Sequence, residues 1–123
     1  MSAVGSGPSS WRREEATEQA RRRDTNESIE ASIRVTGRGS ADMFFCECGD
    51  PRCDRTVCVT VQEYESVRER PNRFLIVLNH ENPEAEYVIS ETERFAVIET
   101  LVGEASKVAL RSDPRSRSMA EWN

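Results

Sequence analysis

Short segments in which hydrophobic and polar residues alternate predict a small and mostly antiparallel sheet. Residues 43–45 form an apolar run, and residues 56–61 alternate between valine on one face and threonine or cysteine on the other. Such alternation is typical of a strand that buries one face. Because these two segments flank a Gly-Asp-Pro turn, they predict a hairpin. Residues 73–78 predict a core strand, and residues 86–90 and 94–99 predict a second hairpin.

Three helices are expected around these strands. Residues 60–63, Thr-Val-Gln-Glu, form a capping-box pattern that predicts a short helix from about Val61 to Glu69, and residues 103–110 predict another. Residues 11–36 are rich in Glu, Arg, Ala and Gln, which favour a longer N-terminal helix. A second capping-box pattern at residues 24–27 indicates a new helix start within that segment. Because its apolar positions are few, we interpret the segment as a solvated helix with a thin apolar stripe, docking weakly on the core or on a partner.

Three of the four cysteines lie close together in the segment Phe-Cys-Glu-Cys-Gly-Asp-Pro-Arg-Cys, residues 45–53. Tight turns that contain glycine are the usual way to direct several thiolates at one point. Zinc takes four ligands in tetrahedral geometry, and Cys46, Cys48 and Cys53 supply three of them. The segment therefore predicts a zinc knuckle with a structural ion.

The fourth ligand is either Cys58 or His80, the only histidine of the chain. Cys58 lies in the middle of a predicted strand, on the face opposite its valines and away from the turn. His80 lies in a polar loop directly after the predicted core strand, and neighbouring strand ends in a sheet bring such loops together. These positions favour His80 over Cys58.

Other interpretations of the cysteines have weaker support. The spacing fits no ferredoxin pattern, which argues against an iron–sulfur cluster. A thiol redox sensor would need an exposed, reactive thiol, for which Cys58 is the best candidate. His80-Glu81 resembles the start of a zinc-protease motif, but the required second histidine is replaced by Glu84 and Pro83 would break the helix. A site with four protein ligands is also closed to catalytic water, so we expect no enzymatic activity.

Together these features predict an α+β fold, in which a small, mostly antiparallel sheet carries the zinc knuckle, one short inserted helix and an N-terminal helix. Residues 1–10 are expected to be disordered, and residues 11–38 to form the helical segment. Residues 41–111 should form the zinc-stabilised domain, and residues 112–123 a flexible tail.

Composition limits the range of partners. The 123 residues carry 32% charged side chains and a net charge of -5, which disfavours general nucleic-acid binding and suits a basic protein partner. We therefore expect a regulatory or adaptor protein. Its candidate contact surfaces are the N-terminal helix and two acidic groups, Glu63/Glu65/Glu69 and Glu81/Glu84/Glu86. The alternative is a transcription-associated zinc protein that contacts nucleic-acid phosphates through Arg12, Arg13, Arg21, Arg22 and Arg23.

The apolar segments are too short to suggest a membrane span or a signal peptide. We therefore expect the cytoplasm as the location and no contact with a membrane. Thiols remain reduced in the cytoplasm, where clustered cysteines favour a metal over disulfides.

The cysteine segment, residues 60–68 (TVQEYESVR), residues 80–84 (HENPE) and residues 26–30 (NESIE) together resemble a family of small uncharacterised proteins common in actinobacteria. The resemblance covers roughly residues 24–114. It implies a Cys3His site formed by Cys46, Cys48, Cys53 and His80, because the family typically lacks a cysteine at the position of Cys58. The sequence departs from the family at Leu78-Asn79, where Pro-Gly usually precedes the histidine. The resemblance implies no activity.

Overall fold

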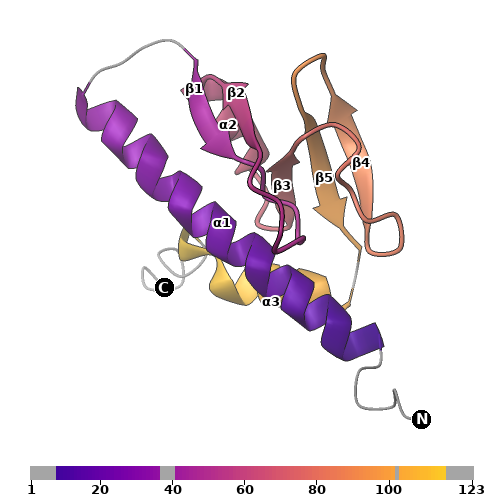
Figure 1. The fold of residues 1–123 in the computed structure, drawn as a ribbon. Coiled ribbons are helices and arrows are strands. Elements are labelled where there is room, and N and C mark those ends of the chain that lie inside the picture. Colours follow the sequence, from indigo (N-terminus) through magenta and orange to yellow (C-terminus); the bar gives the residue numbers. More distant parts are fainter. Residues whose placement is uncertain (1–7, 37–40, 102, 116–123) are drawn as a thin grey trace.

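The computed structural model describes residues 8–36, 41–101 and 103–115 and confirms the predicted α+β class (Figure 1). In chain order the elements are α1 (Pro8–Thr36), β1 (Asp42–Phe45), β2 (Thr56–Val59), α2 (Val61–Val67), β3 (Arg73–Ile76), β4 (Glu86–Glu91), β5 (Ala96–Thr100) and α3 (Glu104–Ser112). The strands of the described residues form two antiparallel sheets, the hairpin β1–β2 and a three-stranded sheet in the order β3-β5-β4. The single small sheet expected from the sequence is thus divided in two.

The first hairpin follows the predicted alternation. Phe44 pairs with Val57 across the strands, and both side chains are buried, whereas Cys58 is exposed on the opposite face. The chain then enters α2 through the predicted capping box, in which the Thr60 hydroxyl accepts the Glu63 N–H and the Glu63 carboxylate accepts the Thr60 N–H. Tyr64 of α2 stacks on Phe44 with ring centroids 4.8 Å apart, which anchors the short helix on the hairpin.

The hairpin also connects to the second sheet. The Glu47 N–H donates to the Leu75 carbonyl at 2.7 Å, so the chain just after β1 runs beside β3. Buried residues of both sheets, α1, α2 and α3 form one hydrophobic cluster. Because β3 runs beside the cysteine segment, the loop that follows β3 is brought to the same end of the molecule.

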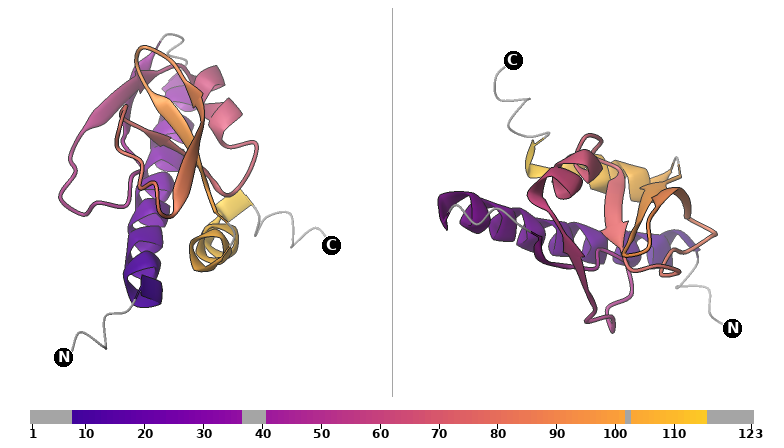
Figure 2. Two further views of the ribbon diagram at one scale, coloured as in Figure 1. Left: turned by 90° about the vertical axis from the view of Figure 1, so that its right-hand side faces the viewer. Right: turned by 90° about the horizontal axis from the view of Figure 1, so that it is seen from above.

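The long helix α1 lies along the molecule and packs against α3 and against β1 of the first hairpin (Figures 1 and 2). It is one continuous helix of 29 residues, so the second helix start expected at residues 24–27 is wrong. The two residues between the capping positions, Thr25 and Asn26, bond elsewhere. The Thr25 hydroxyl donates to the Arg21 carbonyl one turn earlier, and the Asn26 side chain bonds the backbone of Phe45.

The expectation that α1 is largely solvated and weakly docked is also wrong. The predicted apolar positions Ala16, Ala20 and Ile33 are buried, and Ile29 packs against the core. Much of the docked face is nevertheless polar. Its buried polar residues are Gln19, Arg23, Asn26 and Glu30.

Both chain ends depart from the predicted boundaries. Pro8–Ser10, expected to be disordered, already belong to α1, and residues 1–7 lie outside the described residues, as do residues 37–40. In the predicted tail, Asp113 is buried and ion-paired with Arg68, and Arg115 contacts three carboxylates. The first part of the predicted tail is therefore packed against the domain, and residues 116–123 lie outside the described residues.

Candidate metal centre

The structure brings together the four side chains that the sequence singles out as ligands. One ligand atom from each of Cys46, Cys48, Cys53 and His80 lies within 4.8 Å of all the others. Nδ1 of His80 lies 3.6 Å from Sγ of Cys46 and 3.6 Å from Sγ of Cys53. Cys58 is exposed on β2 and is not a member of the cluster.

These distances fit a tetrahedral metal ion. Zinc–sulfur bonds of about 2.3 Å and zinc–nitrogen bonds of about 2.0 to 2.1 Å place the sulfur and nitrogen ligands of a tetrahedron about 3.6 Å apart. The separations from His80 Nδ1 to Cys46 and to Cys53 equal that edge length. The three sulfurs and the imidazole nitrogen all lie within 4.8 Å of one another, close enough to surround a single ion.

Local backbone geometry explains how one short segment supplies three thiols. The Cys46 N–H donates to the Arg55 carbonyl at 3.0 Å and so continues the hairpin beyond β1. Extended chain alternates its side chains, so Cys46 and Cys48 turn toward the cluster while Glu47 turns into the core. The Cys53 N–H donates to the Asp50 carbonyl at 3.0 Å and closes the turn that returns Cys53 to its partners.

The histidine reaches the cluster through a tight turn after β3. The Val77 N–H donates to Cys46 Sγ at 3.3 Å, and the His80 N–H donates to the Val77 carbonyl at 3.1 Å. Asn79 takes a left-handed backbone with φ of 70° at the third position of this turn, where glycine and asparagine are favoured. Leu78-Asn79 thus provides a turn that leads directly into the ligand.

Positive charge and hydrogen bonds compensate the thiolates. Nη1 of Arg22 lies 3.8 Å from Cys48 Sγ, and the same guanidinium donates to the backbone carbonyls of Cys46 and Asp50. The hydrogen bond between the two buried thiols raises the pKa of Cys46 and lowers the pKa of Cys48 to about 5. The lowered pKa of Cys48 favours its thiolate, which is the form that binds a metal cation.

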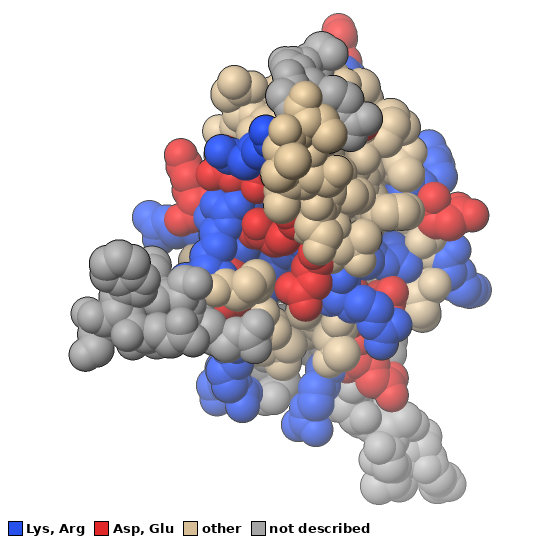
Figure 3. Space-filling view, turned by 90° about the vertical axis from the view of Figure 1, so that its left-hand side faces the viewer, with Lys and Arg blue, Asp and Glu red and all other residues tan. Residues whose placement is uncertain are grey.

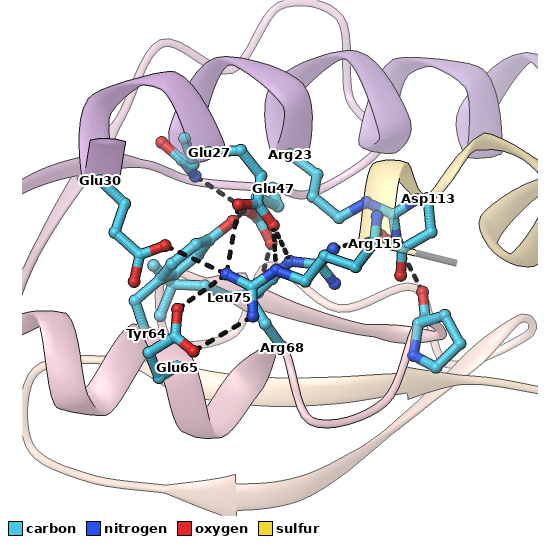
Figure 4. A network of polar contacts seen from close by, with 12 residues as sticks. Arg23, Glu27, Glu30, Glu47, Tyr64, Glu65, Arg68, Leu75, Asp113 and Arg115 are labelled. Atoms are coloured by element: carbon cyan, nitrogen blue, oxygen red, sulfur yellow. Dashed lines mark hydrogen bonds and ion pairs between the residues drawn. The ribbon is translucent and has the colours of Figure 1, made fainter. Parts of the chain in front are cut away.

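Sequence reasoning missed the role of Glu47, which lies between two ligands and is fully buried. Its carboxylate accepts hydrogen bonds from Asn26 Nδ2 at 2.8 Å, Tyr64 Oη at 2.6 Å and the Leu75 N–H at 2.9 Å (Figure 4). Burial raises its pKa, against the effect of the hydrogen bonds from Tyr64, Leu75 and Asn26. The signal available in the sequence was its position, since the residue between two inward-facing cysteines must turn the other way, into the core.

The acidic groups proposed as contact surfaces are largely engaged within the chain. Glu86 is buried and not a surface residue, because its carboxylate accepts from Gln19 Nε2 at 2.6 Å and from the Asn82 N–H at 2.8 Å. Glu63 pairs with Arg94, and Glu65 pairs with Arg115. These carboxylates are therefore already used in contacts within the chain.

The arginines proposed for phosphate binding are also partly used inside the protein. Arg23 is fully buried and donates to the Ala109 carbonyl at 2.9 Å, and its guanidinium lies over the Phe74 ring. Arg22 contacts the cysteine segment. On the face drawn in Figure 3, positive and negative side chains are interspersed beside an uncharged area, and no continuous basic stripe crosses it.

No protein-family model matches the chain, and neither does any curated protein or solved structure. The actinobacterial resemblance therefore stays a prediction. Within the described part of the chain, none of the helices has the length and apolar character that a membrane span requires. What the fold and the site together define is an α+β protein with a Cys3His cluster that has metal-binding geometry.

Proposed function

We propose that the protein is a non-enzymatic zinc-binding module, with a structural Zn²⁺ held by Cys46, Cys48, Cys53 and His80. The observation that carries this proposal is the mutual approach of the four ligand atoms to within 4.8 Å. Thiolate and imidazole are the ligands that zinc prefers, and a tetrahedral arrangement of sulfur and nitrogen selects zinc over calcium or magnesium. Four protein ligands leave no position for a catalytic water, which supports a structural role.

The ion would join two segments that are distant in sequence. The cysteines come from the end of the first hairpin, and His80 comes from the loop after β3. Such a cross-link stabilises a small domain because it holds parts of the chain that a modest core holds less firmly. The ion would also hold the first hairpin in one conformation. A regulatory or adaptor protein needs such a fixed surface to bind its partner.

Metal analysis tests the proposal directly. Protein purified without chelator should contain about one zinc per chain, and cobalt substitution should give the absorption of a tetrahedral thiolate site. His80→Ala should weaken binding strongly, whereas Cys58→Ser should bind zinc like the wild type. A wild-type protein that takes up no zinc, or a Cys58→Ser variant as defective as His80→Ala, would contradict the assignment.

The proposal that the module acts through a protein partner rests on its acidic balance, with 22 acidic and 17 basic residues. A basic protein surface is the chemistry that such a balance favours. Cross-linking of the zinc-loaded protein in extracts of its source organism should capture a basic protein, and the complex should weaken at high salt. Capture of nucleic acid with the same salt dependence would instead favour the alternative, a transcription-associated zinc protein.

A further inference from the structure

Four polar residues of α1 lie on one face of the helix. Three of them contact the segments that carry the proposed ligands, and the fourth, Gln19, contacts Glu86 at the start of β4, which bonds the loop of His80. The four are Glu15, Gln19, Arg22 and Asn26, and we call them the clamp residues. Their spacing of four, three and four residues places them along one side of a helix. Nothing in the spacing of the cysteines requires such a row, so the row needs an explanation of its own.

Two clamp residues hold the loop that bears His80. Glu15 accepts a hydrogen bond from Asn82 Nδ2 at 3.0 Å, and Gln19 donates to Glu86 Oε2 at 2.6 Å. The other carboxylate oxygen of Glu86 accepts the Asn82 N–H at 2.8 Å. The chain two residues beyond the histidine is therefore fixed to α1.

The other two clamp residues hold the cysteine segment. Arg22 donates to the Asp50 carbonyl at 2.7 Å and to the Cys46 carbonyl at 3.3 Å. The Asn26 side chain bonds both backbone groups of Phe45, accepting its N–H at 2.8 Å and donating to its carbonyl at 2.9 Å. Asn26 thus takes the place of a neighbouring strand along the free edge of β1.

Gly49 shows how closely α1 approaches the turn. A Cβ atom at this position would lie 2.3 Å from Glu15 Cγ and 3.0 Å from the Glu15 carbonyl oxygen. Gly49 does not have a positive φ. It is therefore needed for the close approach of the helix and not for a left-handed backbone.

Resting on the proposed zinc site, we propose that Gln19 and the other clamp residues are positioning residues of the metal centre. The helix holds the two ligand-bearing loops at the separation that one ion requires. Metal binding and docking of α1 are then linked, and linkage is reciprocal. If docking of α1 raises the metal affinity by some factor, metal binding raises the equilibrium constant for docking of α1 by the same factor.

Gln19→Ala is the sharpest test, because Gln19 bonds Glu86 and none of the four ligands. The zinc affinity, measured by competition with a chromophoric chelator, should fall about fivefold or more, the lower end of typical coupling. Two controls should keep the wild-type affinity. Ser28→Ala alters an exposed position of α1, and Ile98→Val weakens the buried core in β5 without touching the clamp.

The outcomes separate this inference from the proposed function. If the wild type binds no zinc, the proposed function fails and the inference fails with it. If the wild type binds zinc and Gln19→Ala binds it equally well, or no more weakly than Ile98→Val, the inference alone is overturned.

Hydrogen exchange of the wild type tests the reciprocal effect. Removal of zinc should speed amide exchange in α1 around residues 19–26 more than in β5 (Ala96–Thr100). Equal loss of protection in both elements, or unchanged protection in α1, would overturn the linkage, because the ion would then have no preferential effect on the helix.

Discussion

Two regions of the molecule hold α1, and they use different chemistry. In one region, the clamp residues bond the segments of the candidate metal centre through hydrogen bonds, and those of Arg22 to Asp50 and of Asn26 to Phe45 are made to backbone groups. In the other region, Glu27 pairs with Arg68, the C-cap residue of α2, and both Glu27 and Glu30 pair with Arg115 (Figure 4). The first region would be completed by an ion that binds from solution, whereas the second is complete within the chain.

The arginine side chains of the second region differ in their exposure to solvent. Arg68 has no exposed side-chain surface and pairs with Glu27 at 2.6 Å and with buried Asp113. Arg115 is about one third exposed and contacts Glu27, Glu30 and Glu65. Loss of one member of a buried pair leaves a charge without compensation, whereas exposed pairs contribute little. The two regions should therefore respond differently to single substitutions.

The largest effect is expected in the metal region. Cys48→Ser removes a buried ligand and with it most of the zinc affinity, and structural zinc contributes on the order of 10 kcal/mol in small domains. The variant should show no cooperative thermal transition near that of the zinc-loaded wild type. Cys58→Ser is the matched control and should unfold like the wild type. A Cys48→Ser protein of normal stability would mean that the cluster does not support the fold.

The charge region should give the next largest effect. Arg68→Ala leaves the buried Asp113 carboxylate and Glu27 without their partner, and breaking a buried pair in this way costs about 3 to 5 kcal/mol. Urea unfolding of the zinc-loaded protein measures the loss. Arg70→Ala, at an exposed position three residues before β3, is the control. A loss below about 1 kcal/mol would show that the pair acts like an exposed one.

The same contrast explains which parts the sequence predicts. Cysteine is rare, so the spacing of Cys46, Cys48 and Cys53 with a single histidine already indicates the metal cluster. Strand alternation and the Thr60 capping box are likewise local, and the structure bears them out. Ion pairs carry no such local signal, because any of 22 acids can pair with any of 17 basic residues. For that reason the sequence predicts a solvated α1, and it carries no signal for the buried pair of Asp113 with Arg68.

The pH dependence of stability tests the polar contacts that Glu86 makes in the metal region. Burial raises its pKa from 4.5 to about 7, although hydrogen bonds from Asn82 and Gln19 oppose the shift. The folded state therefore binds this proton more tightly than the unfolded state, and its contribution to stability falls as the pH rises from about 4.5 to 7. Glu86→Gln carries no such proton. Relative to the wild type, the free energy of unfolding of this variant should rise by up to about 3 kcal/mol between pH 4.5 and pH 8.

Urea unfolding of both proteins at pH 5 and pH 8, with zinc in excess, measures this difference. Groups that titrate alike in the two proteins cancel in the comparison. A Glu86→Gln variant that loses stability relative to the wild type as the pH rises would show that the ionised carboxylate is favoured in the folded protein.

The smallest effect is expected at the turn that presents His80. Asn79 has a φ of 70°, a conformation that glycine adopts freely, asparagine tolerates and other residues adopt at a cost of about 1 to 2 kcal/mol. Asn79→Ala should therefore lower the stability of the zinc-loaded protein by about 1 kcal/mol, and Asn79→Gly should change it little. Because the turn only orients the imidazole, both variants should still bind one zinc. Equal stability of the two variants would mean that the left-handed backbone does not constrain this residue, and that the ion determines the path of the loop.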